Sequence, residues 1–368
     1  MSQAPDPAHR LLLLGLRQSL TVDEGQWDRI LRLARRTGLH ARVAANHLDG
    51  NVRLTDPVRR HLLSAVRVAA YRAQMVRAEL FRLATHCKGD FPVVVLKGGA
   101  YILENRALAV GRFVSDVDIL VPKTALRTME ERLRGAGWAP APLNPYDERY
   151  YRDWSHETPP LRFPGRSLEV DLHHAITPVT GRLAFDPETL FETIRPIPGT
   201  PFHVLAPEDQ ALHACLHCFQ DGDLELRVRE IVDIDGLLRA LASAPGFWDR
   251  LLLRAAQLGL ERPLWYGLRY ARAWLDSPIP DEVFQALPAP NAVARRLMDT
   301  LLPLAMLPSD PDFPEPIQVR LARSALLARY HFLRMPLRLL LPHLARKALL
   351  RGKARFSQSP TGDGNHGV

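Results

Sequence analysis

The sequence predicts an α+β fold, in which a small mixed sheet is flanked by N-terminal and C-terminal helical regions. Residues 8–88 show the apolar spacing of helices, residues 91–174 alternate short β-branched runs with short helices, and helical spacing returns after residue 207. The 368 residues are enough for more than one such unit. We therefore expect a helical bundle over residues 1–88, a core over 89–206, a helical region over 207–356 and a disordered tail over 357–368.

A long helix is expected at the end of the N-terminal region. Asp56-Pro57 predicts its start, because Asp can cap a helix and Pro is tolerated in the first turn. Apolar residues then recur every three or four positions from Leu62 to Leu83, which places them on one face of a helix. This apolar stripe predicts a helix that packs against the core that follows.

The core is predicted to begin at Gly89-Asp90, where the sequence pattern changes. The β-branched run Phe91–Leu96 predicts a buried strand, and Lys97-Gly98-Gly99 predicts a tight turn before a short helix. Pro122 is expected to open another helix, which runs to Leu133. Further strands are predicted over residues 117–121, 150–157, 168–173 and 202–205.

Three aspartates are the candidate catalytic residues. Asp116 and Asp118 stand two positions apart at the start of a predicted strand, so their side chains point to the same face. Asp171 lies on a later predicted strand and can supply a third carboxylate. Carboxylate oxygens together with substrate phosphates suit Mg²⁺, and two bound cations can activate a hydroxyl and stabilise a leaving oxygen. We therefore expect Asp116, Asp118 and Asp171 to bind Mg²⁺ or Mn²⁺.

A phosphate-binding element is expected beside these aspartates. Gly98 and Gly99 lie between a predicted strand and a predicted helix. Glycine allows a close backbone approach there, and the start of a helix offers free N–H groups. Lys97 and Arg112 are nearby cations that can neutralise phosphate charge. Together these residues predict contacts to substrate phosphates.

The order of these motifs resembles that of the DNA polymerase β-type nucleotidyltransferase superfamily. Within it, the chain is similar to a poorly characterised bacterial nucleotidyltransferase family with a K-G start, an R-x-x-S-D-x-D centre and a D-x-H strand. The matching segments here are Lys97-Gly98-Gly99, Arg112–Asp118 and Asp171-Leu172-His173. The resemblance covers roughly residues 10–240, with a longer gap from Gly99 to Asp116 than many members show.

The resemblance implies transfer of a nucleoside monophosphate from an NTP, such as ATP, to an acceptor hydroxyl, with release of pyrophosphate. The acceptor would be a small metabolite, a peptide or a protein, and RNA is a less favoured choice. The alternative is a non-catalytic nucleotide-binding or regulatory protein that retains the fold. The presence of all three expected carboxylates argues against this alternative.

The resemblance also implies a role for each site residue. Asp116 and Asp118 would bind two Mg²⁺ ions, and Asp171 would share one of them and help to deprotonate the acceptor hydroxyl. The residues expected around the bound nucleotide are Lys97, Gly98, Gly99, Arg112, Ser115, His173 and His213.

Other candidate metal sites in the sequence are weaker. Asp233-Ile234-Asp235 repeats the D-x-D pattern inside a predicted helix, where positions two apart do not face each other, so Asp233 is expected to pair with Arg229. His213 and His217 share a helix face near Cys218, but no second ligand pair stands at zinc-finger spacing. We therefore expect these histidines to be buried or to face the cleft.

The net charge of +8 favours anionic partners without choosing among them. Residues 318–356 contain many arginines and lysines and no acid, which is typical of a helix that contacts acidic lipid or RNA and equally of a solvated basic face.

Three cysteines are too few for a disulfide framework and favour a cytoplasmic protein. No apolar run is long enough to predict a transmembrane helix.

Overall fold

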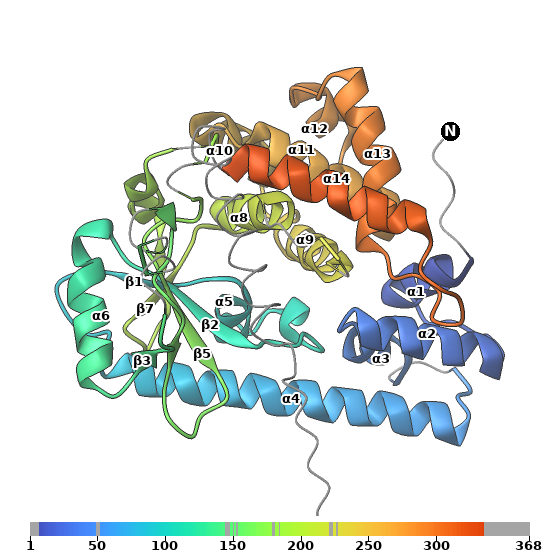
Figure 1. The fold of residues 1–368 in the computed structure, drawn as a ribbon, viewed down its shortest axis with the longest axis horizontal. Helices are drawn as coiled ribbons and strands as arrows, with labels where there is room; N and C mark the ends of the chain where they lie inside the picture. Colours follow the sequence, from blue (N-terminus) through green and yellow to red (C-terminus); the bar gives the residue numbers. More distant parts are fainter. Residues whose placement is uncertain are drawn as a thin grey trace, which may run out of the picture.

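A seven-stranded mixed sheet and the helices packed around it make up the computed structural model (Figure 1). The structure describes residues 7–48, 52–143, 148–149, 151, 154–178, 181–183, 185–220, 224–225 and 227–334. The strands follow the order β3-β4-β5-β2-β1-β7-β6 across the sheet. They are β1 Val93–Val95, β2 Asp116–Leu120, β3 Ala139–Pro140, β4 Leu161–Arg162, β5 Glu169–His173, β6 Arg195–Pro196 and β7 Phe202–Val204. This architecture confirms the predicted α+β fold class.

The parallel strands β2 and β5 organise the candidate site. Their register places Asp118 opposite Asp171. β1 pairs with β2 on its other side, in the antiparallel sense. Val117 and Ile119 alternate with the aspartates along β2 and are fully buried, so the aspartates point to the opposite face of the sheet. The pairing of β2 with β5 therefore brings acids from two distant parts of the chain side by side.

Four helices form the N-terminal part of the molecule. They are α1 Pro7–Arg17, α2 Glu24–Arg36, α3 His40–Leu48 and α4 Asp56–Ala84. Figure 1 shows α4 running from the other N-terminal helices to the sheet. Pro57 lies in the first turn of α4, as predicted, but the capping position is Thr55 and Asp56 belongs to the first turn. A carboxylate in the first turn still favours the helix through its dipole.

A buried glutamate fastens the end of α4 to the strands. Glu79 accepts a hydrogen bond from Trp138 Nε1 at 3.1 Å and another from Arg166 Nη1 at 3.1 Å. Trp138 directly precedes β3, and Arg166 lies between β4 and β5. Because a buried carboxylate without partners is costly, these two donors determine where α4 meets the sheet.

The Lys97-Gly98-Gly99 motif forms the first turn of a helix, so the predicted tight turn is wrong. This helix, α5, spans Lys97–Leu103 and starts directly after β1 and Leu96. Both glycines are buried, and a Cβ at Gly99 would stand 2.8 Å from Cγ1 of Val95. The missing side chains therefore let α5 pack closely against the strand that precedes it.

The predicted strand over residues 150–157 is also wrong. Tyr151 and Trp154 are helical, while Tyr150 and residues 152–153 lie outside the described residues. Among the described residues of this segment, Glu157 pairs with the sheet through an isolated bridge to His173. The other predicted strands correspond to β2, β5, β1 and β7. The helix expected after Pro122 consists of the 3₁₀ turn η2 Lys123–Ala125 and α6 Leu126–Gly135.

Helices form most of the chain after β7. They are α8 Pro207–Gln220, α9 Val228–Leu241, α10 Phe247–Leu258, α11 Glu261–Leu275, α12 Asp281–Ala286, α13 Ala292–Met306 and α14 Ile317–Arg334. Two further 3₁₀ turns, η1 Ala107–Ala109 and η3 Pro187–Thr193, precede them in the chain. α8 packs against α9, α10 and α11, and Figure 1 shows α8 and α9 above the strands. The helices α8 and α9 are thus the ones that reach toward the site.

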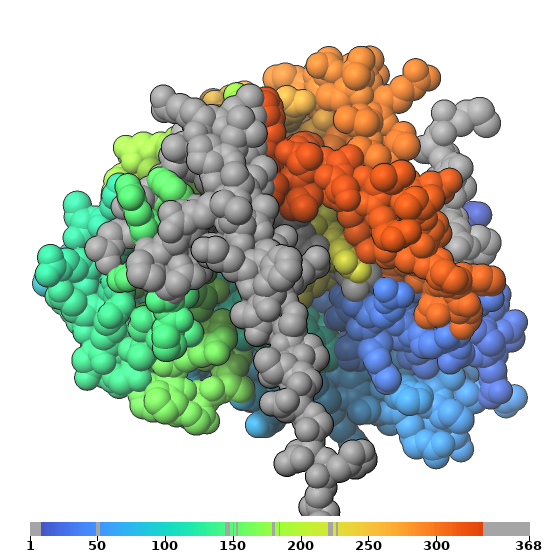
Figure 2. Space-filling view, in the orientation of Figure 1, coloured from blue at the N-terminus to red at the C-terminus, as the bar shows by residue number. Residues whose placement is uncertain are grey.

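The basic stretch 318–356 is only partly described. Its first part forms α14, which Figure 2 shows lying across one face of the molecule. Residues 335–356 and the predicted disordered tail 357–368 lie outside the described residues. In the portion of the chain that the structure covers, no helix has both the length and the apolar character needed to cross a membrane.

One apolar core joins the sheet to the C-terminal helices. Val94 of β1, Ile119 of β2, Leu216 of α8 and Ile231 of α9 belong to the same buried cluster. A second cluster, centred on Trp27 and its neighbours, lies among the N-terminal helices. The predicted domain boundaries near residues 88, 206 and 356 remain a prediction.

We predict that Arg254→Ala destabilises the protein by about 3–5 kcal/mol, because it leaves the buried charge of Asp209 with only the Thr193 hydroxyl as a donor among the described residues. Arg254 makes two hydrogen bonds to Asp209, at 2.7 and 3.0 Å, and the Asp209 side chain is 0% exposed. The control is Arg127→Ala, which removes a pair with Glu131 in which the two side chains are 89% and 64% exposed. This control is expected to leave stability nearly unchanged. Chemical denaturation measures both, and equal losses would contradict the prediction.

Candidate active site

Asp118 is the central charged residue of the candidate site. It is 4% exposed. Lys97 Nζ lies 2.9 Å and His173 Nε2 lies 3.0 Å from the same carboxylate oxygen, Oδ1 of Asp118. Burial alone would raise the pKa of Asp118, but Lys97 and His173 hold that pKa well below its usual range. Asp118 is therefore ionised at neutral pH.

The backbone at Lys97 directs this cation toward Asp118. Lys97 has a φ of +46°, in the left-handed region that residues other than glycine rarely adopt. Burial opposes the charge of its ammonium group, but Asp118 outweighs that effect and raises the pKa of Lys97. The ion pair with a buried carboxylate compensates for the unfavourable backbone conformation, and such strain is typical of functional sites.

Asp116 and Asp171 lie beside Asp118, and their surroundings raise the pKa of both carboxyl groups. Burial, followed by the negative charge of Asp118, raises the pKa of Asp116. Burial, Asp118 and Glu157 together raise the pKa of Asp171 to about 7. The three aspartates and Glu157 thus concentrate negative charge at one place, which a bound cation would relieve.

The residues present fit a divalent cation that binds through oxygen. Oδ1 of Asp171 is buried and has no hydrogen-bond partner among the described residues. A buried acceptor without a partner is costly, and a hard cation is the partner that carboxylate oxygens prefer. Oδ1 of Asp118 is already engaged by Lys97 and His173, so its other oxygen, Oδ2, is the candidate ligand. The site therefore suits an ion that keeps several waters, as Mg²⁺ does.

A second group of potential ligands adjoins the aspartates. His156, Glu157 and His173 each offer a ligand atom, and these atoms all lie within 4.8 Å of one another. Within the described part of the chain, the three aspartates do not meet that distance criterion as a group. Ions held by the aspartates would therefore depend on water or substrate oxygens to complete their coordination.

The residues predicted to bind phosphate have different surroundings: the two glycines are buried in packing contacts, whereas Ser115 is exposed. A Cβ at Gly98 would overlap the guanidinium group of Arg112, so Gly98 is needed for the close approach of that arginine. Gly99 packs on β1 in the same way. Ser115 is exposed and adjoins Asp116. The phosphate contacts of these residues stay predictions, while the packing role of the glycines is visible in the structure.

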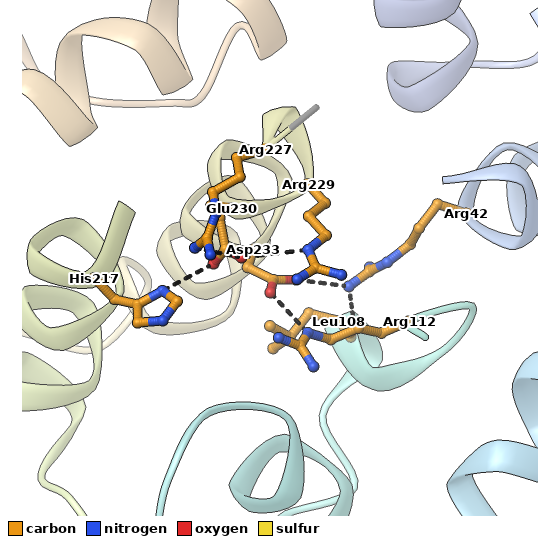
Figure 3. Close-up of polar contacts among 8 residues, drawn as sticks. All are labelled: Arg42, Leu108, Arg112, His217, Arg227, Arg229, Glu230 and Asp233. Atoms are coloured by element: carbon orange, nitrogen blue, oxygen red, sulfur yellow. Dashed lines mark hydrogen bonds and ion pairs between the residues drawn. The ribbon is translucent and has the colours of Figure 1, made fainter. Parts of the chain in front are cut away.

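Arg112 is held by a buried aspartate on α9 (Figure 3). Its Nε donates to Oδ2 of Asp233 at 2.7 Å. Arg42 of α3 lies on the other oxygen, with Nη2 at 3.4 Å from Oδ1, and also donates to the Leu108 carbonyl. Burial opposes the charge of Arg112, but Asp233 raises the pKa of this arginine above its ordinary value. One carboxylate thus links a helix of the N-terminal part, the segment before β2 and α9.

The predicted pairing of Asp233 with Arg229 is therefore wrong. Arg229 lies instead against Glu230, with Nε at 3.3 Å from Oε1 (Figure 3). His217 of α8 reaches the other oxygen of Glu230, with Nδ1 at 3.4 Å. Asp233 instead forms ion pairs with two arginines from other elements, Arg42 and Arg112. Helical spacing alone gives no information about partners that come from elsewhere in the fold.

His213 lies close to Lys97 and is buried, as expected for a histidine near the cleft. Burial, followed by the positive charge of Lys97, lowers the pKa of His213 well below its usual value. A neutral imidazole can donate or accept a hydrogen bond without adding charge. Within the described residues, His213, His217 and Cys218 do not form a metal-binding group, and His217 is engaged by Glu230.

His156 and Glu157 are not recognisable from the sequence as candidates for the site. Both lie at the end of the segment 150–157, for which the sequence predicts a strand with a polar face, so their polarity is visible in the sequence but their location is not. Glu157 reaches the site because it bridges to His173 on β5. These residues come together because two distant segments of the chain pair, and no motif in the sequence predicts that pairing.

Comparisons with known proteins give one match. A model of a protein family described as an uncharacterised nucleotidyltransferase matches residues 23–276. No curated protein and no solved structure matches the chain. The matched range includes Lys97, the three aspartates, His173 and α9, so the candidate site lies entirely inside the family region.

We predict that Asp171→Asn stabilises the metal-free protein at pH 8, by roughly 2–4 kcal/mol. The pKa of Asp171 is about 7 in the folded protein, above its value of about 3.9 in an unfolded chain. The folded state therefore binds more protons between these values, and its stability falls as the pH rises through this window. The asparagine variant lacks this loss, so its advantage is smaller at pH 5.

Denaturation in EDTA at pH 5 and pH 8 measures this difference. Asp90→Asn, at an exposed position, is the control and should leave stability within about 0.5 kcal/mol. A variant Asp171→Asn that is no more stable than the unmodified protein at pH 8 would contradict the prediction.

Proposed function

The chain belongs to this family of uncharacterised nucleotidyltransferases, and on that premise we propose that it transfers a nucleoside monophosphate from an NTP to an acceptor hydroxyl, releasing pyrophosphate. The observation that carries the proposal is the alignment of Asp118 with Asp171 on parallel strands, with Asp116 and Lys97 beside them. This arrangement combines oxygen ligands for cations with a positive charge for phosphate, which phosphoryl transfer requires.

Asp116, Asp118 and Asp171 would hold Mg²⁺ or Mn²⁺. Bound ions of this kind neutralise phosphate charge and favour ionisation of an attacking hydroxyl. Asp118 is the residue best prepared for this role, because Lys97 and His173 keep it ionised. Asp116 adds a second carboxylate from the same face of β2.

Asp171 is the residue that we assign to the proton of the acceptor. Its Oδ1 atom is buried and lacks a partner among the described residues, and its pKa is about 7. A general base works best when its pKa is near the operating pH. Asp171 is therefore the proposed acceptor of the hydroxyl proton, through the carboxylate oxygen that the cation does not occupy.

Lys97 is the cation that we assign to the phosphates. Its ammonium group is the positive charge nearest the aspartates, at 2.9 Å from Asp118. Arg112 is occupied by Asp233 and so is less available than the sequence suggests. Ser115 and the first turn of α5, with Gly98 and Gly99, are the proposed contacts for the rest of the triphosphate, and His213 adds a neutral imidazole next to Lys97.

The proposal predicts NTP turnover that depends on Mg²⁺ or Mn²⁺ and on the aspartates. Each labelled NTP is incubated with the protein, one of the two metals and a cell extract as the source of acceptors. Asp116→Asn/Asp118→Asn should reduce label transfer or pyrophosphate release by more than about 100-fold, because even residues that only support metal ligands contribute 10–100-fold. Asp235→Asn, in the second D-x-D pattern on α9, is the matched control and should keep activity.

Three outcomes separate the candidate functions. Turnover that is lost in the double variant supports the enzyme. Metal-dependent nucleotide binding without turnover, lost in the same variant, favours the non-catalytic alternative and overturns the proposed reaction. Neither turnover nor binding with any NTP would also overturn the proposal.

A further inference from the structure

His156, Glu157 and His173 form a compact group that the proposed reaction does not use as a unit. Their ligand atoms all lie within 4.8 Å of one another. Nδ1 of His173 is 3.5 Å and Nε2 of His156 is 3.8 Å from Oε2 of Glu157. The two imidazole rings lie with their centroids 5.4 Å apart. One carboxylate oxygen thus faces two histidine nitrogens.

The hydrogen bond to Asp118 determines which nitrogen of His173 carries a proton. Nε2 of His173 lies 3.0 Å from Oδ1 of Asp118, and an ionised carboxylate can only accept. Nε2 therefore donates, and in a neutral ring Nδ1 carries the lone pair. Nδ1 is buried and makes no hydrogen bond among the described residues. A lone pair that faces Glu157 at 3.5 Å is an unfavourable contact of two acceptors, unless a positive charge lies between them.

Two kinds of positive charge can resolve this contact. One is a second proton, which would make His173 an imidazolium between Asp118 and Glu157. The other is a metal ion bound to Nδ1, with Asp118 as the outer partner of Nε2. Histidines that bind metals commonly donate their other nitrogen to a carboxylate in this way. The position of His156 favours the metal. A protonated His173 would need only the carboxylates of Asp118 and Glu157, whereas a metal bound to His173 and Glu157 would gain His156 as its third ligand.

We propose that His156, Glu157 and His173 bind a divalent transition metal, such as Zn²⁺, at a site distinct from the magnesium site of the aspartates. Two imidazole nitrogens and one carboxylate are ligands that Zn²⁺ and Co²⁺ accept readily and that Mg²⁺ does not prefer. The side chains of His156 and Glu157 are 21% and 27% exposed, so the metal has access to solvent. Three protein ligands with an open position match zinc sites that also bind water or a substrate.

The location gives this second site a connection to the first. Asp118 accepts a hydrogen bond from His173 and is itself one of the carboxylates assigned to Mg²⁺. A metal at Nδ1 fixes the tautomer and the ring orientation of His173, and so fixes one of the two donors that hold Asp118. The proposal nevertheless stands on the ligand group alone and does not depend on nucleotidyl transfer.

The test uses the full-length protein without an affinity tag, freed of metal with a chelator. Co²⁺ is the probe, because its visible absorption reports the number and type of ligands. Zn²⁺ binding is measured by calorimetry in excess Mg²⁺. With Mg²⁺ in large excess at the aspartates, we expect a single Co²⁺ per chain in a site of low coordination number, displaced by Zn²⁺.

The variants separate this site from the aspartates and from general effects of histidine. His156→Ala and Glu157→Gln are expected to weaken Zn²⁺ binding by at least about tenfold, and both residues are partly exposed, so the fold should tolerate them. His61→Ala, at an exposed position on α4, and Asp116→Asn should bind Zn²⁺ as the unmodified protein does. Circular dichroism verifies that each variant is folded.

Several results would overturn the proposal. One is a protein that binds neither Co²⁺ nor Zn²⁺, which leaves the imidazolium as the explanation for His173. Another is a cobalt spectrum that persists in His156→Ala. A third is loss of the spectrum in Asp116→Asn with retention in Glu157→Gln, which assigns the ion to the aspartates. Failure of nucleotide turnover leaves each of these measurements unchanged, so the two proposals fail separately.

Discussion

The buried charge of Asp118 is the constraint on which the site depends. A carboxylate that is 4% exposed must be compensated, and both of its compensating donors act on one oxygen. Lys97 comes from the first turn of α5, where it adopts an unfavourable φ, and His173 comes from the end of β5. The need to neutralise one side chain thus determines how α5, β2 and β5 meet. The negative charge of Asp118 also raises the pKa of its neighbours Asp116 and Asp171.

A second buried carboxylate, Asp233, carries the same constraint to the helices around the core. Arg112 and Arg42 approach it from the segment before β2 and from α3. Removing one partner of such a group leaves an uncompensated charge, which costs more than the pair itself contributes. The absence of a side chain at Gly98 allows Arg112 to reach this position. The glycine motif next to Lys97 therefore links the candidate active site to α9 through packing.

The sequence could predict those features that depend on neighbouring residues. The β-branched runs gave β1 and β2, and the two-residue spacing placed Asp116 and Asp118 on one face. The alignment of Asp118 with Asp171 needs the register of two distant strands, which local patterns do not contain. The helical start at Lys97 depends on packing against Val95, and the partner of Asp233 depends on which arginine arrives from another element. The acids, Lys97 and His173 were therefore predictable as members of the site. The ion pair of Lys97 with Asp118 and the grouping of His156 and Glu157 with His173 were not.

The uneven ionisation of the acids gives them different chemical roles. Asp118 is held ionised by Lys97 and His173, so it can bind a cation over a wide pH range. At Asp171, burial together with the charge of Asp118 outweighs the opposing effect of His173 and brings the pKa to about 7. An acid that is fully ionised has little tendency to take a proton, whereas an acid with a pKa near the operating pH can take and release one. In the proposed reaction the same pair of strands would thus supply a permanent ligand and a proton acceptor, because Lys97 and His173 lie on only one of the two carboxylates.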